Sequence, residues 1–114
     1  MSGISTHVLD TAAGKPGVGI GVHLEYFEEP GIWRLLASQR TDEDGRCKHL
    51  LPSTMSLKQG RYRLRFETGS YFEVRSLEGF YPVVEITFLV RAVDAHMHIP
   101  LLLAANGYTT YRGT

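Results

Sequence analysis

Residues 61–67 read Arg-Tyr-Arg-Leu-Arg-Phe-Glu, and this alternation of charged and apolar side chains decides the fold class. Successive side chains of a β-strand point to opposite faces of its sheet, so Tyr62, Leu64 and Phe66 would face a core. A helix would bring residues three and four apart onto one face and would mix the two kinds of side chain here. The stretch therefore predicts a half-buried β-strand.

The same two-residue period recurs elsewhere in the chain. In residues 20–27, one face would carry Ile20, Val22, Leu24 and Tyr26 and the other Gly21, His23, Glu25 and Phe27, which predicts a second half-buried strand. Residues 82–91 are rich in Val, Ile, Phe and Thr, and they predict a strand that is buried along most of its length. Residues 4–9 and 33–39 are predicted as weaker strands, and residues 99–104 and 108–111 complete the set.

Turn-forming residues separate these segments. Clusters of Gly, Pro and Asp occur at residues 13–17, 28–31 and 42–45. The pair Asn106-Gly107 predicts a hairpin, because both residues tolerate a positive φ. Only residues 69–78 lack the alternation, and they predict a short helix. The pattern as a whole predicts an all-β protein, a β-sandwich, formed as a single domain over residues 1–114.

Composition argues against several classes of function. Twelve Lys and Arg residues balance 12 Asp and Glu residues, so the chain lacks the basic surplus that is typical of nucleic-acid binding. No apolar stretch approaches the roughly 20 residues that cross a bilayer, and the N-terminus shows no signal-peptide pattern. The single Cys47 cannot form an intrachain disulfide. We therefore expect a cytoplasmic protein without nucleic-acid or membrane partners, and its zero net charge favours self-association.

Residues 96–114, which read HMHIPLLLAANGYTTYRGT, carry much of the candidate site chemistry. His96 and His98 would share one face of a strand because side chains alternate. This spacing is common among metal ligands, and His7 could supply a third nitrogen. A zinc hydrolase with His7, His96 and His98 as ligands is therefore one hypothesis. Local spacing fixes no third ligand, however, and a nearby Arg would be electrostatically unfavourable beside a metal.

Arg46 is a further candidate, because Gly45 permits a sharp turn that would place Arg46 at the start of a strand. The simpler interpretation is a surface Arg that pairs with the carboxylates of residues 42–44. The alternative is a planar, permanently charged group that holds an anionic or carbonyl-rich ligand. The segment Tyr111-Arg112-Gly113-Thr114 is unlike a featureless disordered tail, which predicts that it belongs to a site or an interface.

Four segments, taken together and in this order, resemble a known family. They are residues 7–16, residues 44–47, the run His96-Met-His-Ile-Pro-Leu-Leu-Leu103 and the segment Gly107-Tyr-Thr-Thr-Tyr-Arg-Gly-Thr114. They resemble the transthyretin-related proteins and, within them, the 5-hydroxyisourate hydrolases of urate degradation. The H-x-H-x-P-L-L run combined with the Tyr-Arg-Gly ending distinguishes these hydrolases from the hormone carrier transthyretin.

The resemblance implies a transthyretin-like sandwich of two four-stranded sheets with one short helix, assembled into a homotetramer as a dimer of dimers. It implies hydrolysis of 5-hydroxyisourate, with ring opening, and neither a metal nor an organic cofactor. The active sites would lie in the channel between dimers. The residues implied as catalytic are His7, Arg46, His98 and Thr114, and these would bind the substrate together with Tyr111, Arg112 and Gly113.

The chemistry needs a base for water and a cation for the charge that develops on oxygen. Either His98 or His7 could take the proton from water while the other holds or protonates the ring, and Arg46 would stabilise negative charge. Which histidine is the base stays open. A rival hypothesis from another class is a transthyretin-like carrier without catalysis. Thr114 stands where the family usually has Ser, so the hydroxyl group is kept.

Overall fold

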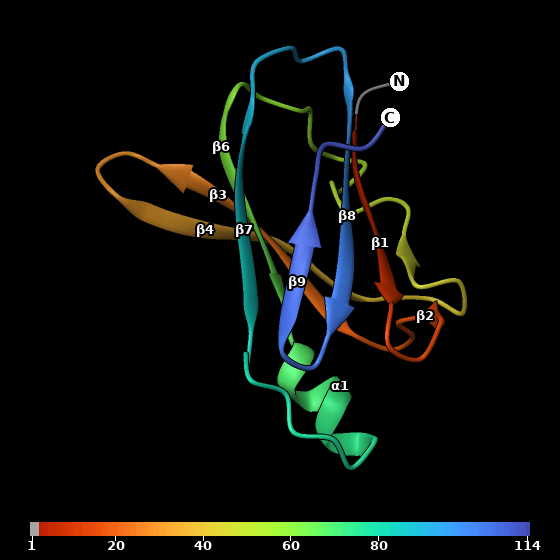
Figure 1. The fold of residues 1–114 in the computed structure, drawn as a ribbon. Coiled ribbons are helices and arrows are strands. Elements are labelled where there is room, and N and C mark those ends of the chain that lie inside the picture. Colours follow the sequence, from red (N-terminus) through yellow and green to blue (C-terminus); the bar gives the residue numbers. More distant parts are fainter. Residues whose placement is uncertain (1–2) are drawn as a thin grey trace.

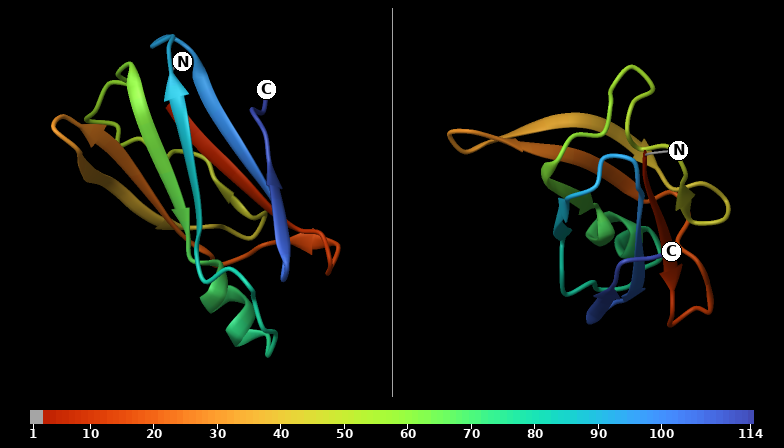
Figure 2. Two further views of the ribbon diagram at one scale, coloured as in Figure 1. Left: turned by 60° about the vertical axis from the view of Figure 1, so that its left-hand side comes forward. Right: turned by 90° about the horizontal axis from the view of Figure 1, so that it is seen from above.

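The computed structural model describes residues 3–114, and two β-sheets facing each other make up most of it (Figure 1). One sheet contains β1 (Gly3–Asp10), β2 (Lys15–Pro16), β5 (Arg46–Cys47), β8 (His96–Ala104) and β9 (Gly107–Thr110). The other contains, in spatial order, β4 (Ile32–Arg40), β3 (Gly21–Glu28), β6 (Gly60–Phe66) and β7 (Val84–Val90). The helix α1 (Thr68–Val74) follows β6 and lies at one end of the sandwich (Figure 2). The all-β sandwich with a short helix is confirmed.

The first sheet is four strands wide although it contains five strand segments. Strand β8 pairs with β1 in parallel along the whole length of β1. The two-residue strands β2 and β5 both pair antiparallel with β1, so they share its other edge. Strand β9 pairs antiparallel with β8 and completes the order β2-β1-β8-β9. The predicted width of four strands per sheet is therefore found, with one edge position divided between two short segments.

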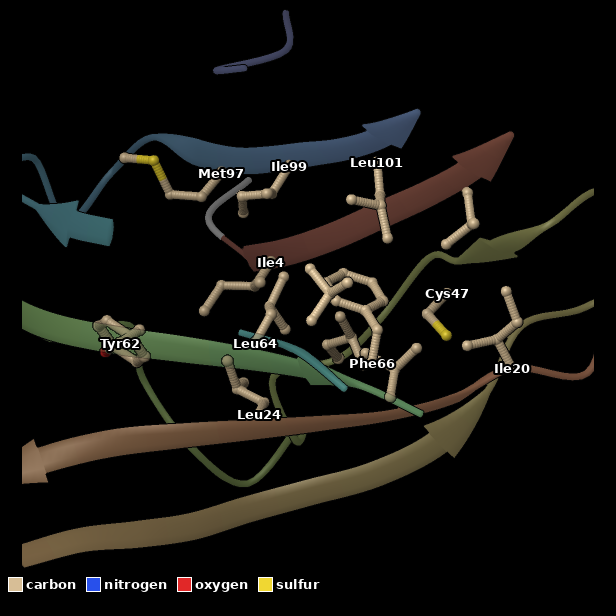
Figure 3. Packing of buried hydrophobic residues seen from close by; sticks show 14 of the residues in the cluster. Ile4, Ile20, Leu24, Cys47, Tyr62, Leu64, Phe66, Met97, Ile99 and Leu101 are labelled. Carbon is tan, nitrogen blue, oxygen red and sulfur yellow. The ribbon is translucent and has the colours of Figure 1, made fainter. Parts of the chain in front are cut away.

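The core lies between the sheets, and the alternation in β6 forms part of it (Figure 3). Tyr62, Leu64 and Phe66 are at most 1% exposed, as the sequence pattern predicts. Ile4 and Leu101 meet them from the facing sheet, and both are fully buried. Burial of each such side chain stabilises the fold by about 1.5–3 kcal/mol before the entropy of ordering the chain is subtracted.

Strand β7 forms where it is predicted, but the expectation that most of its length is buried is wrong for this chain. Only Val84 and Val90 are buried, whereas Glu85, Thr87 and Leu89 are exposed. The reason is position, because β7 is an edge strand that pairs only with β6. Its richness in β-branched and aromatic residues indicates a strand, and it does not distinguish a central strand from an edge strand.

The hairpin between β8 and β9 is confirmed, but the reason given for it is wrong. Ala104 pairs with Gly107, so the two turn residues are Ala105 and Asn106. Within residues 3–114, Ser76 is the only residue other than glycine with a positive φ, so this turn does not use the conformation that favours Asn-Gly.

Among the described residues 3–114, no helix is long and apolar enough to cross a membrane.

Candidate active site

Strand pairing brings three of the predicted site residues to one face of the first sheet. Arg46 on β5 lies directly opposite His7 on β1, and His98 on β8 pairs with Ser5, two residues before His7. Ile4 and its same-face neighbours on β1 point into the core, so Ser5 and His7 point outward. This face therefore gathers imidazole and guanidinium groups from three strands that are far apart in the sequence.

Ser5 joins the two histidines of β8, and sequence reasoning did not assign it a role. Its Oγ atom lies 2.8 Å from Nε2 of His96 and 2.8 Å from Nδ1 of His98. The signal in the sequence is that Ser5 shares a strand face with His7. The parallel register between β1 and β8 is what places Ser5 beside His96 and His98, and the local sequence pattern does not show this register.

A cavity of about 360 Å³ opens beside these groups, and we call it the His98 cavity. It is lined by Ser5, Thr6, Arg46, Lys48, His96, His98 and Thr114. Its volume falls in the range of small-molecule sites, and its lining carries two permanent cations together with imidazole and hydroxyl groups. A larger cavity of about 700 Å³ lies elsewhere, against α1 and β3, and His23 is one of the residues that line it. The His98 cavity is the better candidate because three of the predicted site residues, Arg46, His98 and Thr114, line it and His7 lies opposite Arg46.

The C-terminal tail folds back beside His98. The backbone N–H of Gly113 donates to the carbonyl oxygen of His98 at 2.8 Å, and Thr114 lines the His98 cavity. Tyr111 and Arg112 line a neighbouring cavity of about 420 Å³ against β7, which His98 also borders. The residues of the tail thus line two different cavities of this chain. The predicted contacts of Tyr111, Arg112, Gly113 and Thr114 with a substrate stay predictions.

The surroundings of His98 disfavour its charged form. Burial lowers the pKa of His98 below the ordinary value of 6.5, and the positive charge of Arg46 and the nearby His7 and His96 lower it further. A hydrogen bond with the backbone of Ser5 acts in the opposite direction and raises the pKa of His98. His98 is therefore neutral at pH 7, which is the state that a general base requires.

Two alternative chemistries gain no support from the site. Within residues 3–114, no three His, Cys, Asp or Glu side chains are grouped so that they could hold a metal ion, and the zinc-hydrolase hypothesis is not favoured. Burial, followed by the charge of Asp42, raises the pKa of Cys47 to about 11, so its thiol is protonated at neutral pH. A protonated, buried thiol is a poor nucleophile.

Gly45 sets the position of Arg46, and it provides a test of the turn. Gly45 has a φ of +77°, and a Cβ added there would collide with the carbonyl oxygen of Val8 and lie 3.1 Å from Cβ of Pro16. We expect Gly45→Ala to lower the free energy of unfolding by more than the roughly 1–2 kcal/mol cost of a left-handed conformation. Urea unfolding measures this, with Gly14→Ala as the control because Gly14 has a φ of +70° and open space around it. Equal losses in the two variants would contradict the steric argument.

The fold and the site together define a class: a transthyretin-like β-sandwich with a histidine–arginine cluster on the outer face of one sheet. The chain belongs to the HIUase/Transthyretin family, whose model matches residues 4–113. The resemblance predicted from the sequence motifs is therefore confirmed.

Three relatives illustrate the range of this family. A 5-hydroxyisourate hydrolase of Caulobacter vibrioides is 44% identical over 119 aligned positions that cover the whole of both chains. The structure of Klebsiella pneumoniae 5-hydroxyisourate hydrolase has a TM-score of 0.85 and 35% identity, and the match covers 99% of this chain and all of that one. Sea bream transthyretin in complex with thyroxine has a TM-score of 0.90 and 25% identity, over 96% of this chain and 93% of that one.

Proposed function

We propose that this chain is a 5-hydroxyisourate hydrolase, which opens the six-membered ring of its substrate with water. The observation that carries the proposal is the His98 cavity, where a neutral imidazole and a guanidinium group lie on one wall. The relatives support it, because one that matches over the full length of both chains is named for this activity. The test is to generate 5-hydroxyisourate in place from urate with urate oxidase and to measure whether the protein accelerates its decay above the spontaneous rate.

The proposed reaction needs one base, one cation and one proton for the leaving nitrogen. His98 takes a proton from water as the resulting hydroxide adds to a ring carbonyl carbon. Arg46 stabilises the charge that develops on the carbonyl oxygen, and His7, opposite Arg46, orients the ring. The ring C–N bond then breaks, and the leaving nitrogen receives a proton. Each of these groups contributes at least ~10²-fold to the rate in comparable enzymes.

A carrier without catalysis is the second candidate function, and the lining of the cavity argues against it. A site for a large apolar ligand is lined mainly by apolar side chains. The His98 cavity instead presents Arg46, Lys48 and two histidines, which suit a small heterocycle rich in carbonyl groups. Tight thyroxine binding together with no acceleration of 5-hydroxyisourate decay would favour the carrier.

The pH dependence of the reaction follows from the environment of His98. If neutral His98 is the base, kcat/KM rises with pH and levels off above the pKa of His98, which lies below 6.5. Arg46 lowers that pKa, so Arg46→Gln should move the rising limb to higher pH in addition to slowing the reaction. A pH–rate series from pH 5 to 8 on both proteins measures the shift. A limb that stays in place, or moves to lower pH, would exclude His98 as the group that titrates.

We further propose a homotetramer, a dimer of dimers, as the working assembly. The support in this chain is a set of exposed apolar side chains on β7, on β9 and in the tail, namely Leu89, Tyr108 and Tyr111. Edge strands β7 and β9 also leave backbone groups without a neighbouring strand in the described chain. Size-exclusion chromatography with light scattering should give about four times the 12.8 kDa chain mass. A monomer at micromolar concentration would contradict the proposal.

A cytoplasmic location also stays a prediction. Its support is Cys47, which is free and buried, as in proteins of reducing compartments. Fractionation of the source cells, with detection of this protein in each fraction, tests it.

A further inference from the structure

The hydroxyl group of Ser5 lies between two imidazoles, and it carries only one hydrogen. Its Oγ atom is 2.8 Å from a ring nitrogen of His96 and equally far from a ring nitrogen of His98. Since Ser5 can donate only one of these two hydrogen bonds, at least one ring must donate to it. When the other ring accepts the hydrogen of Ser5, the three groups form one hydrogen-bonded chain. The protonation states of the two rings are therefore linked through Ser5.

We propose that Ser5 and His96 form a proton relay for His98 in the hydrolysis, an inference that rests on the function proposed above. In the resting enzyme, Nδ1 of His98 donates to Oγ of Ser5, and Ser5 donates to Nε2 of His96. This arrangement leaves Nε2 of His98 without a hydrogen, which is the form that can accept a proton from water.

The relay moves one proton away from His98 and later returns it. Nε2 of His98 takes a proton from water, and the hydroxide forms a bond to the carbonyl carbon. Nδ1 of His98 then passes its proton to Ser5 while the hydroxyl proton moves to Nε2 of His96, so His96 carries the positive charge. When the ring C–N bond breaks, the proton on His96 returns through Ser5 to Nδ1 of His98 in the same step, so His98 stays neutral as it gives the hydrogen on Nε2 to the leaving nitrogen. Reverse transfer through Ser5 restores all three groups, and no other reactant is needed.

The surroundings of His98 disfavour a positive charge on its own ring. His98 is half-buried and lies near Arg46, whereas His96 is exposed at the start of β8. The Nδ1 edge of His96 faces Gly3, where an added Cβ would lie only 3.2 Å from Nδ1. The titratable or charged groups around His98 in the His98 cavity and on β1 are Arg46, His7, His96 and Lys48. The neighbouring cavity of about 420 Å³, which His98 also borders, adds Arg91, Tyr111 and Arg112.

The first test does not depend on activity. Nitrogen-15 NMR of the histidine rings in the substrate-free protein reports which ring nitrogen carries hydrogen. At pH 7.5 we expect a hydrogen on Nδ1 of His98 and none on Nε2 of His96, and we expect Ser5→Ala to abolish this preference. The opposite pair of tautomers, or tautomers that are unchanged in Ser5→Ala, would overturn the relay.

The second test is kinetic and uses a double-variant cycle. Ser5→Ala and His96→Gln should each lower kcat by ~10-fold or more while KM changes less than twofold, because the relay acts on proton transfer. His96→Gln keeps a polar group at an exposed position, so it also serves as the variant that should fold if Ser5→Ala does not. His49→Gln, an exposed histidine outside the cavity, is the control and should leave kcat unchanged.

The cycle separates a relay from two independent structural effects. If the two groups act as one chain, the double variant should be no slower than the slower single variant. Multiplied losses, or a rise in KM without a fall in kcat, would contradict the relay. An inactive wild-type protein would refute the proposed function instead, and the NMR result would then still decide whether the hydrogen-bonded arrangement exists.

Discussion

Replacing His98 with Ala is expected to lower kcat for 5-hydroxyisourate by at least ~10²-fold, because the reaction would lose the general base that we propose. His98 is the imidazole that lies on the wall of the cavity, is neutral at pH 7 and sits within reach of the charge of Arg46. A fall of this size is larger than the loss of a binding contact would give, since water must then be deprotonated by solvent. Steady-state kinetics with substrate generated in place measures the change.

The matched control for this variant is His23→Ala, on the opposite sheet. His23 pairs with Ser38 and Glu67 and lines the larger cavity, so its loss should leave kcat within twofold of the wild type. Circular dichroism and thermal unfolding of both variants show whether the fold is intact. A folded His98→Ala variant with a near-normal rate would remove His98 from the mechanism and would make His7 the remaining candidate for the base.

The parts of the fold that could be predicted are those in which local pattern has one physical meaning. The alternation in residues 61–67 predicted buried Tyr62, Leu64 and Phe66, and all three lie in the core. A two-residue period matches the alternation of side chains along a strand and does not match a helix, so it indicates both the strand and the face that is buried. Burial of β7 could not be predicted in this way, because it depends on which strands lie beside β7 and not on its own residues.

Most residues of the candidate site could be predicted from the sequence, but the hydrogen bonds between them could not. His7, Arg46 and His98 stand out by residue type and by their resemblance to the family, and strand pairing brings them to one face. Ser5 does not stand out, because its role follows only from the register that sets it beside His98. The pairing of β1 with β8 joins residues that are far apart in the sequence, so the local pattern around Ser5 does not show which side chains it will meet.

The role of the C-terminal tail, residues 111–114, could also be predicted only in part, and a substitution in it should strongly reduce activity. The sequence predicted a site role for the tail, but only the structure shows that Gly113 lies against the ring of His98. A Cβ added at Gly113 would be 2.5 Å from Cδ2 of His98, closer than real Cβ contacts come. We therefore expect Gly113→Ala to push the imidazole away from Ser5 or to release the tail from the carbonyl of His98, and in either case to lower kcat by ~10-fold or more.

Gly107→Ala is the control for Gly113→Ala, because Gly107 begins β9 and a Cβ there has nothing within 4 Å. Both variants remove the same backbone freedom from the C-terminal segment, so only the contact with His98 differs between them. If Gly113 acts through His98, its variant should lose kcat and also the NMR signature of the hydrogen bond between His98 and Ser5, while Gly107→Ala keeps both. A Gly113→Ala variant that loses substrate affinity but retains kcat and the His98 signature would show instead that the tail serves only to hold the substrate.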